Sequence, residues 1–322
     1  MPRLPRSPAS SFTAVPGGDR IGLGITLTLL AVLAFALLDG TVKYLSAFVP
    51  LLVVVWVRYA MQAGVMALWL AWAGGRTLFR VAHPKFQALR GTLLVAMSVL
   101  AFLGLQAMPV AEFTAIAMLA PVMVTLLSPL LLHERVSALR WALVLLALAG
   151  GLIVVRPGSG LFGAGAVFPL LVALSGAMFQ ILTRRMASLE SPLTTHFCTG
   201  LVGAVLVTLA LPLSPLPLGA ALAEVSGLQW MLMLVAGLLG TLGHLAFINA
   251  LGIAPMAVLM PFTYTQIAFA AAFSAIVFAH LPDRWAMLGM VVIAAAGALS
   301  VWLNVRIGPK PAVMAVDTTL GD

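Results

Sequence analysis

The chain has 322 residues, of which 62% are hydrophobic and only 8% are charged, and its mean hydropathy is +1.14. Soluble domains carry about 25% charged residues, so this composition excludes an ordinary water-soluble protein and indicates a chain embedded largely in lipid. The net charge of +8 does not indicate a nucleic-acid-binding protein, because the basic residues are scattered among apolar runs and form no single basic face.

Both ends of the chain are polar and are expected to be cytoplasmic tails. Residues 1–19 are rich in Pro, Ser and Gly, which favours a disordered tail, and residues 306–322 form the second tail. The apolar region after the first tail is longer than the roughly 7 to 15 residues of a signal peptide, so we interpret it as a retained span. A transit peptide is the alternative.

The remaining chain predicts an all-α integral membrane protein. Splitting it at Gly, Pro and charged residues gives ten segments of about the 20 residues that a helix needs to cross a bilayer. The predicted segments are 21–46, 50–73, 88–106, 110–131, 138–155, 161–182, 193–212, 228–250, 254–279 and 284–305. Because 161–182 is interrupted by two glycines and a proline, nine and eleven spans are the alternatives.

The basic residues predict the orientation of these segments. Thirteen of the 17 Lys and Arg residues fall on the side that holds the N-terminus, and the other side holds Lys43, Arg156 and Arg284. Arg58 falls inside a span. Since cytoplasmic loops carry the excess of Lys and Arg, we expect both termini in the cytoplasm and a multi-pass protein of the bacterial inner membrane.

Two stretches of the chain look alike, one starting at 106 and the other at 249. Each runs from an amide and an Ala through an apolar helix, a turn with His, an Arg-Trp pair and a closing helix with Ala-Gly. Five spans per copy is an odd number, so the two copies must lie in opposite orientations. Inverted repeats of this kind suit alternating access around a site near the midplane.

The order of these motifs resembles the EamA-type drug/metabolite transporter superfamily. The resemblance is carried by LLDGTVKYL, VVWVRY and LLLHERVSALRW in the first half, and by GHLAFINALGIAPMAVLMPFTYTQ and AHLPDRW in the second. It implies ten helices in two inverted five-helix repeats around a central cavity, at residues 20–156 and 157–305. The turn of the second half departs from the family pattern, because His280 replaces an acidic residue.

Three charged residues lie in or beside the first two spans, where a central charge costs about 2.5 to 3.5 kcal/mol. Asp39 and Lys43 lie one helical turn apart, so they can pair, and Arg58 can reach Asp39. We predict that Asp39 and Arg58 line a water-filled cavity and that Lys43 lies at its outer gate. The structural alternative is a buried ion pair that locks the two spans, with Lys43 reaching the outer surface.

Polar residues of the second half complete the predicted cavity. His244 and Asn249 lie in a glycine-rich span, and His244 is a candidate proton carrier, because imidazole titrates near neutral pH. Pro261 breaks the helix bonding ahead of Tyr264 and Gln266, and broken helices line cavities in transporters. The structural alternatives are a hydrogen bond across a tight helix contact for His244 and an internally satisfied kink at Pro261.

Other polar residues are predicted to lie at the rims of the membrane. His196 is expected at the cytoplasmic interface, and Glu112 is expected to be exposed at the outer entry of its span, with proton acceptance as the alternative.

No catalytic motif, metal-ligand cluster or phosphate-binding loop is present, so we expect no enzyme and no cofactor. The prediction is a secondary transporter of a small organic metabolite, such as an amino acid, a vitamin or a drug-like amphiphile. A proton or a counter-substrate would drive it, and monomer and homodimer are both open. The alternatives are an integral-membrane enzyme acting on lipid-like substrates and a non-transporting scaffold.

Overall fold

The computed structural model describes residues 18–73, 81–131, 138–156, 162–186, 191–213, 218–254 and 256–307. The two expected tails lie almost wholly outside these residues, and helix already begins at Gly18 and extends to Ile307. The described part of the chain is helical and contains no strand.

The helices follow the predicted segments closely. Their bounds are α1 (Gly18–Leu45), α2 (Leu51–Ala73), α3 (Pro84–Ala107), α4 (Val110–Ala117), α5 (Ala120–Leu131), α6 (Ala138–Val155), α7 (Val167–Met186), α8 (Pro192–Ala210), α9 (Leu218–Ala223), α10 (Gly227–Ile253), α11 (Met256–Thr263), α12 (Thr265–Phe278) and α13 (Arg284–Ile307). Short 3₁₀ turns precede α7 and follow α8. The short α9 has no counterpart among the predicted segments.

Seven stretches of helix are long and apolar enough to cross a membrane, and three shorter apolar helices accompany them among the described residues. The long ones correspond to α1, α2, α3, α7, α8, α10 and α12, and the shorter ones to Val110–Val124, Trp141–Val155 and Arg284–Ser300. Large apolar side chains on their outer faces are exposed, among them Trp72 (86%) and Ile276 (82%). Such a surface suits contact with lipid.

The fourth predicted segment is a broken helix, not a continuous one. The chain makes a tighter turn between α4 and α5, where the Leu119 N–H donates to the Ile116 carbonyl at 3.0 Å. Pro121 then occupies the first turn of α5, where its missing N–H costs no helical hydrogen bond. The ninth segment is broken in the same way: α11 contains Pro261, and Tyr264 separates it from α12.

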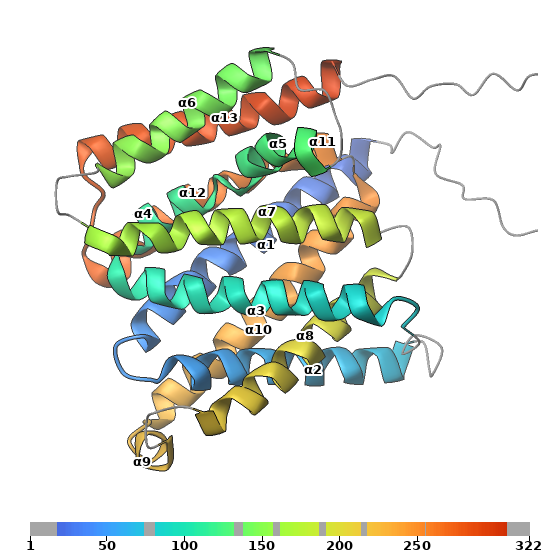
Figure 1. Ribbon diagram of the computed structural model, residues 1–322, viewed down its shortest axis with the longest axis vertical. Coiled ribbons are helices and arrows are strands. Elements are labelled where there is room, and N and C mark those ends of the chain that lie inside the picture. The colour runs from blue at the N-terminus through green and yellow to red at the C-terminus, as the bar shows by residue number, and fades with distance from the viewer. Residues whose placement is uncertain are drawn as a thin grey trace, which may run out of the picture.

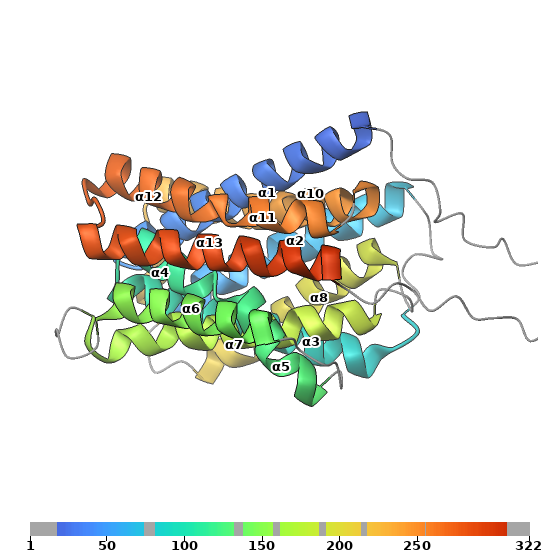
Figure 2. The same cartoon turned by 90° about the horizontal axis from the view of Figure 1, so that it is seen from above.

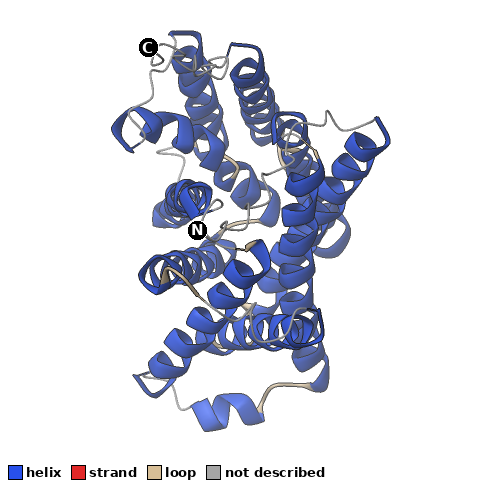
Figure 3. Cartoon of the chain, turned by 90° about the vertical axis from the view of Figure 1, so that its right-hand side faces the viewer, coloured by secondary structure: helices blue, strands red, loops and turns tan. Residues whose placement is uncertain are grey.

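Helices from the first half of the chain pack against helices from the second half. The closest pairs are α1 with α10, α2 with α8, α3 with α7 and α6 with α13, so each pair joins a helix before residue 156 to one after residue 162. Figure 1 shows α6 and α13 side by side along the top, and α2 and α8 along the bottom. The start of α1 and the end of α13 lie at the same end of the bundle (Figure 2). Figure 3 shows the described chain as helices joined by loops, without a strand.

Small residues permit the closest of these approaches. A Cβ placed on Gly289 of α13 would lie 2.6 Å from the Gly150 carbonyl oxygen of α6. Only glycine fits there, so the α6–α13 contact is backbone against backbone.

Candidate functional site

An acidic side chain of the first helix, Asp39, is hydrogen-bonded to a residue near the other end of the chain, Gln266. Asp39 projects from α1, and Gln266, at the start of α12, donates a hydrogen bond from Nε2 to its Oδ2 at 3.4 Å. Gln266 is 7% exposed. The sequence therefore named two residues that the fold brings into direct contact across 227 positions of the chain.

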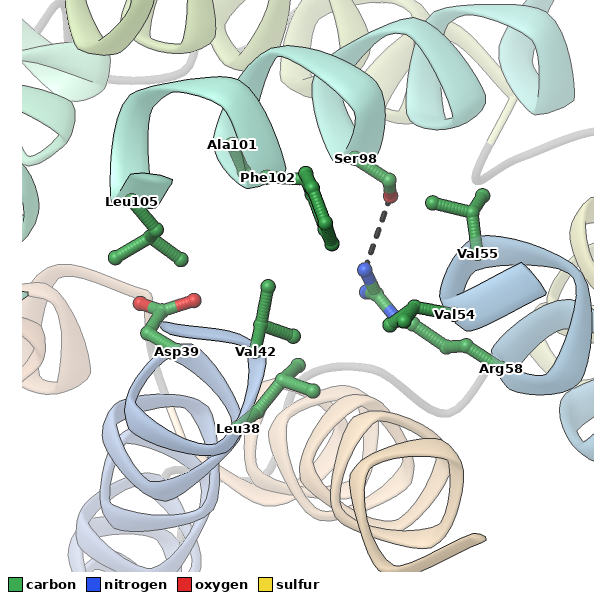
Figure 4. A pocket seen from close by; sticks show the side chains of 10 residues that line it. All are labelled: Leu38, Asp39, Val42, Val54, Val55, Arg58, Ser98, Ala101, Phe102 and Leu105. Carbon is green, nitrogen blue, oxygen red and sulfur yellow. Dashed lines mark hydrogen bonds between the residues drawn. The ribbon is translucent and has the colours of Figure 1, made fainter. Parts of the chain in front are cut away.

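Arg58 of α2 lies on the other side of a small cavity from Asp39 (Figure 4). Its Nη1 donates to Ser98 Oγ of α3 at 3.0 Å, and Ser98 Oγ lies 2.8 Å from Tyr59 Oη. The buried Arg58 Nε has no hydrogen-bond partner. The guanidinium is thus fixed by α3 and keeps one donor unused.

This cavity is narrow. Its volume is about 20 Å³, and apolar side chains complete its walls: Leu38, Val42, Val54, Val55, Ala101, Phe102 and Leu105. A volume of that size holds about one water molecule, whereas pockets for small molecules measure several hundred Å³.

His244 of α10 lies in a second polar group toward the start of α8. Its Nδ1 lies 2.8 Å from the Gly240 carbonyl, to which it donates. Its ring stacks on that of His196, with centroids 5.5 Å apart. Gln62 Nε2 donates to the His196 carbonyl at 3.0 Å.

His196, which was expected at the membrane interface, is buried among the helices and is 1% exposed. A helix of 19 residues can bury its fifth residue when a neighbour covers it, and Gln62 and His244 do so here. No periodicity in α8 alone reveals that cover.

Lys43 does not pair with Asp39. Its Nζ instead donates to the carbonyl oxygens of Gln106 and Met108, at 3.4 and 3.2 Å, in the turn between α3 and α4. Carbonyls at a helix end carry partial negative charge and lack intrahelical partners, so they satisfy an ammonium without a carboxylate. The Asp39–Lys43 pairing that their spacing permits is therefore not formed.

Two predicted residues lie away from the chamber. Tyr264 is 4% exposed and packs against Gly297 of α13, and its buried Oη has no hydrogen-bond partner. Asn249 is exposed and lines a separate, mostly apolar groove of about 430 Å³ with Trp69 and Leu242.

An interaction of Arg90 was missed by the sequence reasoning, which assigned it only to the cytoplasmic side. Arg90 of α3 is 4% exposed, and its guanidinium donates to Thr183 Oγ1 at 2.8 Å, the Thr195 carbonyl at 3.1 Å and Thr199 Oγ1 at 2.5 Å. It also lies over the Phe179 ring. One guanidinium thus ties α3 to α7 and α8.

Two ion pairs join the halves at the end of the bundle opposite to the start of α1. Arg156 Nη2 lies 2.6 Å from Asp283 Oδ2, and His280 Nε2 lies 3.0 Å from Glu112 Oε1. The Ala286 backbone N–H, together with Arg156, holds the pKa of the exposed Asp283 carboxyl below its usual value. Glu112 was expected to be exposed, but its side chain is only 4% exposed, because α4 packs on α12 and α7.

The described part of the chain has no group of three His, Cys, Asp or Glu side chains that could hold a metal ion.

Comparison with known proteins gives matches along most of the chain. Residues 22–156 match the EamA-like transporter family. A riboflavin transporter of Vibrio cholerae is 26% identical over 84% of this chain and 90% of its own length. The pseudopaline exporter CntI of Pseudomonas aeruginosa is 27% identical over 86% of this chain and 95% of its own length. An S-adenosylmethionine uptake transporter of Rickettsia felis is 24% identical over 84% of this chain and 89% of its own length.

A solved crystal structure has the same fold. It superposes with a TM-score of 0.60 and covers 90% of this chain and 99% of its own, at 20% sequence identity. At that identity the likeness concerns the fold alone.

Proposed function

Since the chain belongs to the EamA-type drug/metabolite transporter superfamily, we propose that it is a secondary transporter that moves a small organic metabolite across the bacterial inner membrane by alternating access. The observation that carries this proposal is the chamber between Asp39, Gln266 and Arg58. Buried charge is expensive in a membrane bundle and is retained where it faces a pathway. Here the charges come from α1 and α2, and their polar partner from α12.

The pattern of helix packing supports two inverted repeats of five spans, 20–156 and 157–305. In this arrangement each helix of the first repeat has a counterpart in the second: α1 corresponds to α7, α2 to α8, α3 to α10 and α6 to α13. The contact of α1 with α10 then becomes that of α7 with α3, and both are extensive. The contact of α2 with α10 likewise becomes that of α8 with α3. The two broken spans, each with a proline near its break, are counterparts as well.

Alternating access then consists of separating and rejoining the two halves around the chamber. The narrow cavity between Asp39 and Arg58 is the contracted form, and entry of a solute requires α12 to move from α1. The Gln266–Asp39 hydrogen bond breaks in that step, which leaves a carboxylate and an amide to bind the solute. His244, one layer further toward the cytoplasmic side, is the next polar group on the path.

We place Lys43 at the outer gate, where it closes the turn between α3 and α4. With positive charges concentrated on the side of the termini, that gate faces away from the cytoplasm. Both termini are then cytoplasmic. Tyr264 has a packing role against α13 in this contracted form, and Asn249 belongs to the separate groove.

The chamber favours a solute with charged and hydrogen-bonding groups. One carboxylate, one guanidinium with an unused donor and one amide suit a zwitterionic or multiply polar molecule. The names of the relatives, which cover riboflavin, S-adenosylmethionine and pseudopaline, lie within the class of amino acids, vitamins and related amphiphiles. A gradient of protons or of a counter-substrate supplies the energy.

A thermal-shift screen of the purified chain against a metabolite library tests the proposal, because a ligand that binds the folded state raises its apparent stability by mass action. Solutes that raise the melting temperature are then followed into proteoliposomes. We expect at least one of them to enter faster than into liposomes without protein. A solute that binds but never crosses would contradict transport.

A further inference from the structure

The Glu112 carboxyl is a buried acid with half of its hydrogen-bonding capacity unused. It lies in the first turn of α4 and its side chain is 4% exposed. Oε1 lies 3.0 Å from His280 Nε2, whereas Oε2 is buried without a hydrogen-bond partner. A carboxylate oxygen that is buried and unpaired is costly, so His280 is a partner that this acid needs.

His280 comes from the other half of the chain. It follows α12, where Ala279 adopts the left-handed conformation with φ of 52°, and its own N–H donates to the Ser274 carbonyl at 3.1 Å. The loop thus aims the imidazole at Glu112. Its side chain is 41% exposed, so the imidazole meets the outer solution while the carboxyl does not.

The neighbouring charged groups are engaged elsewhere. Of the helices packed on α4, α1 contributes Asp39, bonded to Gln266, and Lys43, bonded to carbonyls. The end of α6 contributes Arg156, paired with the Asp283 that precedes α13. Arg284 of α13 lies over the Trp285 ring. Helices α3, α7 and α12 place no described charged side chain against Glu112, so His280 is its one ionic partner in the described part of the chain.

We propose that Glu112 and His280 form a latch that closes the outer mouth between the two halves. The proposal rests on the transport function for its purpose, but the latch itself is a property of the fold. His280 Nε2 donates to Glu112 Oε1 and holds the loop after α12 against α4. Breaking this contact leaves both oxygens of the buried carboxyl without a partner and releases the loop.

Thiol labelling of the full chain in nanodiscs tests the latch without any knowledge of the solute. Ala115, one turn along α4 from Glu112, is fully buried and is replaced by cysteine in a Cys198→Ser background. A maleimide is applied at one fixed pH, and each rate is normalised to that of Phe48→Cys, whose parent side chain is 57% exposed.

We expect normalised labelling of Cys at position 115 to be slow in the parent protein and about fivefold faster in Glu112→Gln and in His280→Gln, a typical size for coupling between two sites. His280→Gln alters an exposed loop residue, so it keeps the test valid if Glu112→Gln fails to fold. Asp283→Asn is the matched control, because it breaks the other ion pair at the same end and should leave the labelling rate unchanged.

An unchanged labelling rate in His280→Gln would overturn the latch. An equal acceleration in Asp283→Asn would do so too, since it would indicate general loosening of the outer end. Labelling is independent of solute flux. The latch therefore stands or fails apart from the transport proposal, which the proteoliposome experiment decides.

Discussion

Replacing Asp39 by asparagine while Arg58 is also varied measures the central electrostatic interaction of the chamber. The two charged groups are not in direct contact, and the cavity between them holds about one water molecule. At an effective dielectric constant of about 20, two unit charges about 4 Å apart attract by about 4 kcal/mol, and charges separated by a water molecule attract less. We therefore expect a coupling free energy of about 2 kcal/mol between the two positions.

The assay is a double-mutant cycle on the free energy of unfolding. Asp39→Asn, Arg58→Gln and the double variant are unfolded reversibly in mixed micelles at pH 8, well above the ordinary titration range of a carboxyl group. Each single variant leaves a buried charge without its counter-charge, so the double variant should be less destabilised than the sum of the two. Additivity within about 0.5 kcal/mol would refute the interaction across the chamber.

Three further predictions concern packing and charge away from the chamber. Gly297→Ala places a methyl group into the Tyr264 ring and should cost about 1 to 3 kcal/mol of stability, whereas Gly64→Ala, with open space around it, should cost nothing; equal effects in thermal unfolding would contradict the contact. Asp283→Asn should lower the melting temperature at pH 7, and this difference should shrink as the pH is lowered below the ordinary value for a carboxyl group. The lowered pKa of Asp283 means that its contribution is present above the ordinary value of 3.8 and is lost as the pH falls through the folded value. Arg90→Lys should destabilise by about 2 kcal/mol, because an ammonium cannot match three acceptors in the plane of a guanidinium; an unchanged unfolding curve would contradict this tie between helices.

Spans and their order are local properties, which is why the sequence predicts them well. Runs of apolar residues bounded by Gly, Pro and charge locate every long helix to within a few residues. The break after Pro261 follows from the missing N–H of proline. The break before Pro121 was missed, since its neighbours are apolar and give no other signal.

The candidate site depends on contacts that no local pattern contains. Asp39 and Gln266 were both named from the cost of polar groups in lipid, and their contact depends on how α12 crosses α1. Glu112 was expected to be exposed and is buried, because the helices that cover it lie far away in the chain, and the burial of His196 has the same cause. The sequence places the Asp39 carboxylate four residues before Lys43, but the Lys43 ammonium instead donates to carbonyl groups in a neighbouring turn. A sequence pattern cannot rank such partners.

The most direct test of the chamber compares solute flux in proteoliposomes between two amide variants. Gln266→Ala removes the amide that bonds Asp39 inside the chamber, and Asn249→Ala removes one from the separate groove. With a solute identified by thermal shift and equal amounts of folded protein, we expect Gln266→Ala to lose at least about tenfold in rate, a loss of about 1.4 kcal/mol. Asn249→Ala should stay within about twofold of the wild type. Undiminished flux in Gln266→Ala would contradict a pathway between the two halves at this position.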